Sequence, residues 1–455
     1  MTKLNKLTNY ISILLIFIII FIFIFNFLNY DPIYGYDAEA HYEYVEGFFA
    51  MFVPNASEQP SNEITREFFN PPLPYVIPAV FSYICKNSIE VEDEAKYCQK
   101  IYGKIIQVKN ALLYFLTLYF YLLTFKFITN RSIISLNVLL PISILSVNYK
   151  TFSMIRGEPY IIFFNSVLLF LLAKHLNSEF KLSKKDYVIF GILLGLMGLS
   201  RQWAFLLFPS YTYILFIKNN KEWRENVIKF LVFTFTIAFF VCSWFYFKLL
   251  FEFGTFTAFN MDPSSFNISN QPLDFYLINK NDFINIFNKP IRPNLNNNFL
   301  SIFYSDAWGD YWGYFVFTSR FIDIGRNQLL IGDYLARVNL VSLIPTLLIT
   351  IGLLRSKYYF QEEKLKKFLP FIKFIKISAL FSFVGYLWFL IKYPEIPQGG
   401  TIKATYMIQF FHLCTIPLFF YLDHYQKTKP KVYIFLIILL AFVFGHNFNS
   451  YLSHF

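Results

Sequence analysis

Charged residues are scarce in this chain of 455 residues: they make up only 15% of it, whereas 56% is hydrophobic and 22% aromatic. A soluble globular domain has about a quarter charged residues, so this chain could not keep its apolar surface out of water. The mean hydropathy of +0.44 agrees with that conclusion. The composition therefore excludes an ordinary soluble protein and predicts an integral membrane protein.

Cysteine is also scarce. The four cysteines, which are Cys85, Cys98, Cys242 and Cys414, show no CxxC motif and no metal-ligand spacing. Cys242 and Cys414 lie in apolar runs, where we expect them to be packing residues. Cys85 and Cys98 share one segment that is predicted below to be extracytoplasmic, and a disulfide can form there. The sequence has no internal repeat.

Eleven apolar runs are candidates for membrane spans, because a bilayer core of about 30 Å needs roughly 20 apolar residues in a helix. The first run, 7–28, has no small-residue cleavage site, so we expect a helix that is retained. The others are 105–125, 132–149, 159–175, 187–200, 203–217, 228–250, 334–354, 374–391, 404–421 and 432–448. The segment 71–85 is short and has four prolines, which predicts an interfacial or re-entrant helix. The expected fold is an all-α polytopic membrane protein with about eleven transmembrane helices.

Basic residues indicate the orientation. With the N-terminus inside, the basic loops all face the cytoplasm, as the positive-inside rule requires; they are 126–131, 174–185, 218–229, 355–373 and 427–431. Because these loops carry much of the net charge of +11, we expect no nucleic-acid partner. Two long segments, 29–104 and 251–332, then face the other compartment. We therefore divide the chain into an N-terminal transmembrane module (1–250), an extracytoplasmic cap (251–332) and C-terminal transmembrane helices (333–455).

Acidic residues follow the first predicted helix directly. In the sequence YGYDAEAHYEYVEGF, Asp37, Glu39 and His41 alternate, and in a helix Asp37 and His41 would be one turn apart. Carboxylates at this depth could deprotonate a hydroxyl group or hold a divalent cation. We therefore take Asp37 and Glu39 as candidate catalytic residues and as candidate metal ligands. The alternative is a solvated amphipathic helix on the membrane surface.

Four further clusters are predicted on the same side of the membrane: 156–159, 200–203, 304–314 with the arginines that follow it, and 398–406. Arginine offers a planar pair of donors to a phosphate, and lysine adds a point charge. Arg156, Arg201 and Lys403 are accordingly the candidate ligands of a donor phosphate. The candidate substrate-binding residues are His41, Glu158, Asp306, Asp310 and Arg320. For each basic residue the alternative is contact with lipid headgroups.

The order of these motifs resembles the C-type (GT-C) glycosyltransferases, in particular bacterial relatives of the dolichyl-phosphate-mannose protein mannosyltransferases and of the lipid A aminoarabinose transferases. The matching stretches are Asp37–His41, Asn70–Leu73, Arg156–Pro159, Ser200–Arg201, Asp306–Tyr314 and Lys403–Tyr406. The resemblance implies an inverting transfer of sugar from a polyprenyl-phosphate donor to a glycan, lipid or protein. It also implies an extracytoplasmic active site in the cell (inner) membrane, with Asp37 as the catalytic acidic residue.

The chain departs from this family at two positions. Relatives often have Asp-Glu where this sequence has Asp37-Ala38-Glu39, and often His or Lys where it has Asn70. These departures leave open which carboxylate is the base and whether a metal ion binds.

Two other functions remain. A polysaccharide polymerase or O-antigen ligase also has many spans and a large outer loop, but it relies on loop arginines and needs no acidic motif after the first helix. A transporter of lipid-linked sugars would have ionisable residues near the membrane midplane and repeated halves. Here the main intramembrane candidate, Lys376, lies near a helix end.

Overall fold

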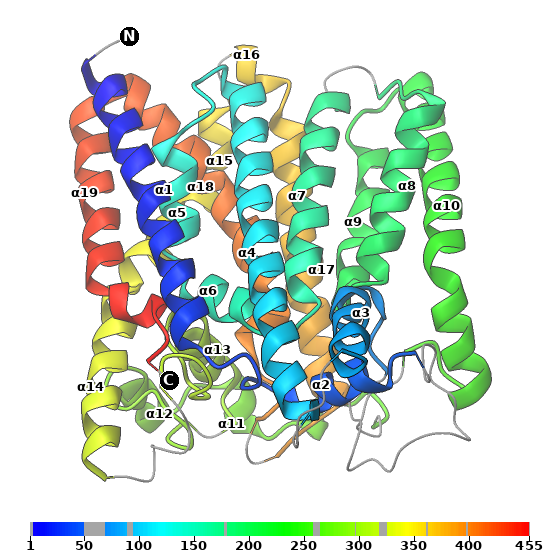
Figure 1. The fold of residues 1–455 in the computed structure, drawn as a ribbon. Helices are drawn as coiled ribbons and strands as arrows, with labels where there is room; N and C mark the ends of the chain where they lie inside the picture. Colours follow the sequence, from blue (N-terminus) through cyan, green and yellow to red (C-terminus); the bar gives the residue numbers. More distant parts are fainter. Residues whose placement is uncertain are drawn as a thin grey trace. The chain divides into compact units, whose positions relative to one another are not determined.

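The computed structural model describes residues 3–49, 69–88, 94–176, 180–257, 264–295, 297–317, 325–360, 363–396 and 399–454. Throughout these ranges the chain forms helices and connecting segments, without a strand (Figure 1). By its contacts it divides into two compact units. Unit 1 comprises Met1–Tyr30, Tyr121–Lys150 and Pro263–Phe455, and unit 2 comprises Asp31–Phe120 and Thr151–Asp262.

In the described part of the chain, six helical stretches are long and apolar enough to cross a membrane, or seven if a bent pair counts as one span. The six are Leu4–Asn29 in α1 (Lys3–Asn29), Lys96–Thr129 in α4 (Glu94–Thr129), α10 (Lys221–Phe253), Ile331–Ser356 in α14 (Gly325–Val341) and α15 (Leu343–Tyr359), α17 (Leu369–Lys392), and Ala404–Thr428, which includes α18 (Ile408–Thr428). The bent pair is α6 (Ser146–Ser153) with α7 (Glu158–His175), at an angle of 118°. The protein is thus a helical, membrane-embedded protein, and eleven spans stay a prediction.

Several predicted spans are shorter or interrupted. The run 203–217 forms three short pieces, namely η2 (Gln202–Leu207), α9 (Pro209–Thr212) and η3 (Tyr213–Phe216). Pro209 has no backbone N–H to continue a helix, which accounts for the break before α9. The runs 187–200 and 432–448 form α8 (Lys184–Gly198) and α19 (Pro430–His446). The proline-rich segment forms α3 (Leu73–Lys86), whose 14 residues are too few to span a bilayer, as expected.

α18 is the central helix of unit 1. It packs against α5 (Leu136–Ser143), α15, α17 and α19, and most of its length is buried. Inside this bundle the His412 imidazole contacts the Tyr121 hydroxyl through Nδ1 (3.1 Å) and the Asn148 amide oxygen through Nε2 (2.7 Å). Both ring nitrogens therefore have partners, as polar groups in an apolar interior require. The predicted span 132–149 is divided here into α5 and the start of α6.

The predicted cap contributes short helices to unit 1. They are η4 (Ile268–Asn270), α11 (Leu273–Tyr276), α12 (Lys280–Ile286) and α13 (Phe299–Trp308), and α14 begins within the same segment. Asn298 joins two of them. Its side chain accepts a hydrogen bond from the Ser301 N–H at the start of α13 and donates to the carbonyls of Asp274 in α11 and of Leu277 directly after it. The remaining short elements of unit 1 are α16 (Glu363–Lys366), η6 (Ala404–Met407) and η7 (Phe448–Tyr451).

In unit 2, α8 packs closely against α7 and α10 (Figure 1). Gly191 and Gly195 allow the approach to α10. A Cβ on Gly191 would lie 2.6 Å from Cβ of Ile237, and one on Gly195 would lie 2.5 Å from Cβ of Val241. Since helices in lipid associate through such close packing, these two glycines fix how α8 and α10 pair.

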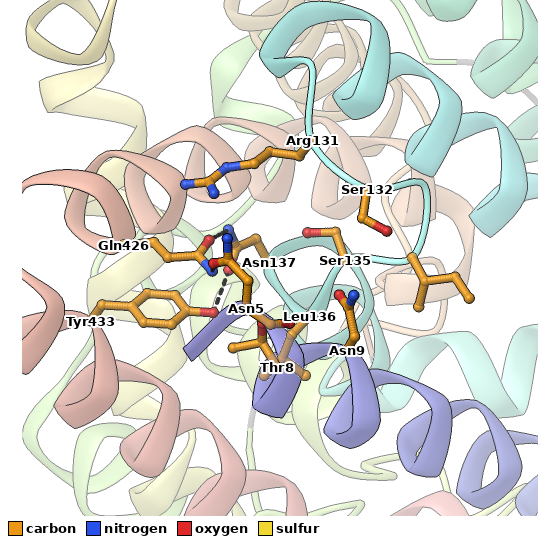
Figure 2. Close-up of a pocket in the computed structure, with 11 residues that line it drawn as sticks. Asn5, Thr8, Asn9, Arg131, Ser132, Ser135, Leu136, Asn137, Gln426 and Tyr433 are labelled. Atoms are coloured by element: carbon orange, nitrogen blue, oxygen red, sulfur yellow. Dashed lines mark hydrogen bonds between the residues drawn. The ribbon is translucent and has the colours of Figure 1, made fainter. Parts of the chain in front are cut away.

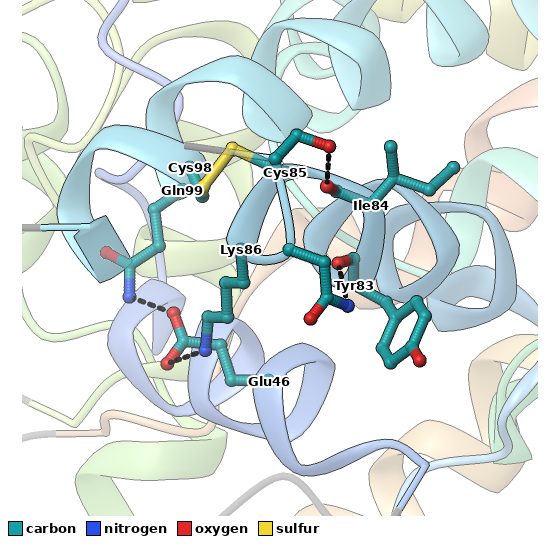
Figure 3. Close-up of a disulfide and its surroundings, with 9 residues drawn as sticks. Glu46, Tyr83, Ile84, Cys85, Lys86, Cys98 and Gln99 are labelled. Carbon is teal, nitrogen blue, oxygen red and sulfur yellow. Dashed lines mark hydrogen bonds and ion pairs between the residues drawn. A yellow bond between two sulfur atoms is a disulfide. The ribbon is translucent and has the colours of Figure 1, made fainter. Parts of the chain in front are cut away.

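Figure 3 shows the disulfide between Cys85 and Cys98, which joins the end of α3 to the start of α4. Glu46, near the end of α2 (Ala38–Gly47), forms an ion pair with Lys86 (3.4 Å) and accepts a hydrogen bond from Gln99 (2.6 Å). The disulfide that the sequence allowed is therefore present. Together with the Glu46 contacts it ties α2, α3 and α4 of unit 2 to one another. Cys242 and Cys414 are buried free thiols, as expected.

Candidate functional site

Asp37 lies at the N-terminal cap of α2, which confirms that a helix follows this residue. Its backbone is left-handed (φ 52°, ψ 26°), a conformation that asparagine, aspartate and glycine adopt more readily than other residues. Aspartate at this position usually accepts a hydrogen bond from the first turn of the helix, but the Asp37 side chain makes no such bond. Asp37 is a half-buried residue, and its negative charge opposes the lowering of the pKa of His41.

His41 is completely buried one turn further along α2. Its Nδ1 lies 2.7 Å from the Tyr75 hydroxyl of α3, and the two rings are stacked. Burial, followed by the positive charges of Arg201 and Arg156, lowers the pKa of His41 well below its usual value, and the opposing effects of Asp37 and Glu158 are smaller. His41 is therefore a neutral imidazole at neutral pH, so the positive charge of this region belongs to the two arginines.

Arg156 occupies the sharp turn between α6 and α7 and is 1% exposed. Its Nε lies 3.4 Å from one carboxylate oxygen of Glu158, the first residue of α7. Its Nη1 donates a hydrogen bond of 3.5 Å to the carbonyl of Tyr36, and the guanidinium lies over the Tyr36 ring, 5.3 Å from its centre. Arg156 thus holds the peptide group that directly precedes Asp37.

Arg201 approaches the same carboxylate from the turn that follows α8. Its Nε lies 3.5 Å from the other oxygen of Glu158, which is fully buried. The two turns are in direct backbone contact, because a Cβ on Gly157 would lie 2.1 Å from the Ser200 carbonyl oxygen. We call Arg156, Glu158 and Arg201 the Arg–Glu–Arg cluster.

The Asn70–Leu73 stretch lies against the second of these turns. The Leu73 N–H donates to the Leu199 carbonyl, and the Gln202 side chain donates to the Phe69 carbonyl. The Asn70 carbonyl in turn accepts a hydrogen bond from the Tyr44 hydroxyl of α2. Unit 2 therefore brings together four of the six stretches that carry the family resemblance, although they are spread over more than 160 residues of sequence.

The charges of the Arg–Glu–Arg cluster do not balance, because two guanidinium groups share one carboxylate. The distances from the two Nε atoms to the Glu158 carboxylate oxygens are 3.4 and 3.5 Å. They are longer than those of short charge-assisted hydrogen bonds, which are roughly 2.7–2.9 Å, so neither arginine forms a bidentate hydrogen bond with Glu158. An unbalanced charge in a buried place is costly unless a partner neutralises it. The arrangement thus favours a neighbouring anion, either Asp37 or a bound anionic group.

The other two stretches meet in unit 1. Buried Lys150 forms an ion pair with Asp306 on α13 and also donates to its carbonyl. The second carboxylate oxygen of Asp306 accepts a 2.6 Å hydrogen bond from the Ala404 N–H at the start of η6. Asp306 therefore fixes the chain next to Lys403, whose Nζ lies 3.3 Å from the Tyr406 hydroxyl.

Asp310 is enclosed by the backbone of its own loop. It accepts hydrogen bonds from the N–H groups of Tyr314, Phe315 and Val316. Burial raises the pKa of Asp310, while Lys150 and the backbone donors oppose the rise. Within unit 1 the carboxylates of Asp306 and Asp310 are thus engaged by donors of the protein itself.

The remaining candidates are placed differently. Glu39 lies on the exposed side of α2, and Arg320 lies outside the described residues. Asp37 and Glu39 are two positions apart at the start of a helix, a spacing at which side chains do not face each other, so they make a poor pair of metal ligands. In the described ranges no group of three His, Cys, Asp or Glu side chains is arranged to hold a metal ion.

Lys150 and Tyr75 were not among the residues predicted from the sequence, and Gln202 was included only as a member of the cluster 200–203. Lys150 directly follows the predicted span 132–149, and a lysine next to an apolar run was the available signal. The contacts of Tyr75 and Gln202 had no local signal, because they join parts of the chain that are distant in sequence.

Comparison with known proteins gives no match: no family model matches the sequence, and neither a curated protein nor a solved structure is significantly similar to it.

Proposed function

We propose that this protein is an inverting glycosyltransferase of the GT-C type, which moves a sugar from a polyprenyl-phosphate donor to a glycan, lipid or protein acceptor. In this proposal about eleven helices span the cell (inner) membrane, and the active site is extracytoplasmic. The observation that carries it is the geometry next to Asp37: Arg156 donates to the carbonyl of Tyr36, directly before Asp37, and shares Glu158 with Arg201.

The chemistry requires both signs of charge. A sugar or protein hydroxyl is a poor nucleophile, so a base must accept its proton while the new C–O bond forms at the anomeric carbon. We assign this role to Asp37. The bond from the anomeric carbon to the phosphate oxygen breaks, and the electron pair leaves with the polyprenyl phosphate, which needs no proton from an acid.

The Arg–Glu–Arg cluster suits the leaving group. Before the reaction, Arg156, Arg201, Glu158 and Asp37 sum to zero charge, with His41 neutral. Once Asp37 has taken the proton, the same group carries one positive charge, just as the phosphate gains negative charge. Preorganised cations beside a developing anion are among the largest contributions to catalysis. Lys403 belongs to unit 1 and stays a candidate phosphate ligand on the sequence alone; the scheme above uses no metal ion.

The disulfide supports the proposed orientation. Disulfides persist in oxidising compartments and are rare in the cytosol. Cys85 and Cys98 flank the chain between α3 and α4, in the segment 29–104 that the basic loops assign to the extracytoplasmic side. Asp37 belongs to that segment as well.

The test is transfer of radiolabelled sugar by purified protein from a polyprenyl-phosphate hexose or pentose to glycan, lipid or protein acceptors extracted from the membrane. We expect Asp37→Asn to reduce transfer by about 10²–10⁴-fold, because the amide cannot accept the proton. Asp31→Asn is the matched control: it neutralises a nearby carboxylate, which binds the Ile33 N–H (3.3 Å), and should retain activity within a few-fold. Equal transfer by wild type and Asp37→Asn would remove Asp37 from the mechanism.

The same assay separates the alternatives. A polymerase or ligase would consume a diphosphate-linked oligosaccharide and leave the monophosphate donor untouched. A transporter would move the labelled lipid between leaflets of a proteoliposome without releasing polyprenyl phosphate.

A further inference from the structure

A small polar cavity lies in unit 1, where α1 begins. Its volume is about 50 Å³. Figure 2 shows that its walls come from the first turns of α1, from the connection between α4 and α5, and from α18 and α19. The lining residues used below are Asn9, Arg131, Ser132, Ser135, Asn137 and Gln426.

One wall is a continuous chain of hydrogen bonds. The Tyr433 hydroxyl donates to the Asn137 side-chain oxygen (2.9 Å), and the Asn137 amide donates to Gln426 (3.0 Å). The Gln426 amide donates in turn to Asn5 (3.3 Å) on α1. Because this chain links three helices and the start of α1, the wall is preformed and would not have to be ordered by a ligand.

The opposite wall offers hydrogen-bond donors. In the described structure the side chains of Asn9, Ser132 and Ser135 make no hydrogen bond to the protein. Ser135 is the N-cap of the eight-residue helix α5, but its hydroxyl does not cap that helix. Leu136 and Asn137, the first two residues of α5, also line the cavity, so the positive end of the helix dipole faces it.

The charge at the edge of the cavity is positive. Arg131 and Lys427 share a single carboxylate, that of buried Asp423, at 2.8 and 2.7 Å. This leaves one positive charge in excess, and exposed Lys6 and Lys429 flank the same segments. Preformed donors, a helix N-terminus and excess positive charge together suit a phosphate group.

The source of the phosphate follows from α1. Asn5 and Asn9 lie where its apolar run begins, which is the depth of lipid headgroups in a bilayer. Beyond them, exposed apolar side chains continue along α1, including Leu14, Phe17, Phe21 and Ile24. A lipid whose phosphate occupies the cavity would have apolar surface for its acyl chains, whereas free phosphate would use none of that surface.

We propose that this cavity binds the phosphate of an anionic phospholipid from the leaflet in which α1 begins. This site is independent of the proposed transferase reaction and serves as a lipid contact that fastens α1 to α5 and α18.

The experiment is thermal unfolding of the full-length protein in micelles that contain increasing phosphatidylglycerol. We expect a saturable rise in Tm of a few degrees, because a ligand that binds only the folded state stabilises it. The same mole fraction of phosphatidylcholine, or millimolar inorganic phosphate, should give less than about a third of that rise. Equal rises with both lipids would overturn the proposal, and so would a full rise with inorganic phosphate.

Two variants locate the site. Asn9→Phe fills the cavity from α1 without touching the Arg131–Asp423 pair, and Arg131→Gln removes the excess charge. Each should raise the phosphatidylglycerol concentration for half-maximal effect at least tenfold. Arg224→Gln is the matched control, since it removes an exposed arginine at the start of α10, in another basic segment, and should change that concentration less than twofold. If one variant fails to fold, the result of the other tests the site. If the folded variants need the same phosphatidylglycerol concentration as the wild type for a half-maximal rise in Tm, the proposed site is wrong.

Discussion

The carbonyl oxygen of Ser200 occupies the space that a side chain on Gly157 would need. The two backbones meet so closely that a Cβ at position 157 would lie 2.1 Å from that oxygen. The φ of Gly157 is −87°, which any residue can adopt, so the requirement for glycine is one of space alone. This contact sets the distance between Arg156 and Arg201, and with it the geometry of the Arg–Glu–Arg cluster.

We therefore expect Gly157→Ala to force the two turns apart. Because the obstacle is backbone, it cannot rotate away, and the substitution should lower the free energy of unfolding by about 1–3 kcal/mol. Unfolding in detergent is monitored by tryptophan fluorescence. Gly445→Ala is the control, since a Cβ there meets nothing within 4 Å in helix α19, and it should be neutral or slightly stabilising. Similar stability of both variants would contradict the close contact.

Glu158→Gln should be more damaging than an ordinary loss of a salt bridge. It removes the carboxylate that two buried guanidinium groups share, and breaking a buried ion pair by removing one partner costs about 3–5 kcal/mol. The comparison is Glu222→Gln, which breaks the exposed pair with Lys181 (2.8 Å) and should leave stability unchanged. Unfolding curves of the two variants under the same conditions decide the matter, and equal curves would mean that Glu158 does not hold the cluster.

Stability should depend on pH through His41. Since burial lowers its pKa in the folded state, the unfolded chain takes up this proton first as the pH falls below about 6.5. The stabilisation is thus present above pH 6.5 and is lost as the pH falls toward the lowered pKa, by at most about 1.4 kcal/mol per pH unit. We expect His41→Asn to have a flatter profile of unfolding free energy between pH 7.5 and 5.5. Parallel profiles would show that His41 does not titrate in this way.

Thiol labelling tests the disulfide. In the unfolded, unreduced protein we expect two alkylated cysteines, Cys242 and Cys414, and four after reduction. Reduction should also lower stability, by about 3 kcal/mol if loop closure dominates, because the bond joins residues 13 apart. The Cys85→Ser, Cys98→Ser double variant should match the reduced wild type and should not respond to reductant. Four reactive thiols without reductant would exclude the bond.

Local patterns predicted much of this region. The four-residue spacing of Asp37 and His41 indicated a helix, and the His41 N–H donates to the Asp37 carbonyl (3.2 Å) at the start of α2. The shortness and prolines of 71–85 indicated a helix that is not a span, and α3 has 14 residues. In each case the information lies within a few turns of chain, where sequence periodicity reports geometry directly.

The arrangement of the charges could not be predicted in the same way. Glu158 pairs with its neighbour Arg156 and also with Arg201, 43 positions later, and Lys150 pairs with Asp306, 156 positions later. Such pairs depend on which helices become neighbours, and a single sequence does not encode that as a local pattern. Pro209 lies within the apolar run 203–217, which was predicted as one span on its hydrophobicity alone. Proline has no backbone N–H to donate, and the helix is interrupted at this residue.

The left-handed backbone of Asp37 determines how a mutational scan at this position has to be interpreted. Most substitutions of Asp37 would reduce activity for two unrelated reasons. They remove the carboxylate, and they introduce a residue for which the left-handed backbone conformation is unfavourable. Asparagine and glycine tolerate that conformation, so only these two report on the chemistry alone. Glutamate keeps the negative charge but adopts the left-handed backbone conformation less readily than aspartate. Low activity of Asp37→Glu would therefore not show how far the carboxylate can lie from the acceptor hydroxyl.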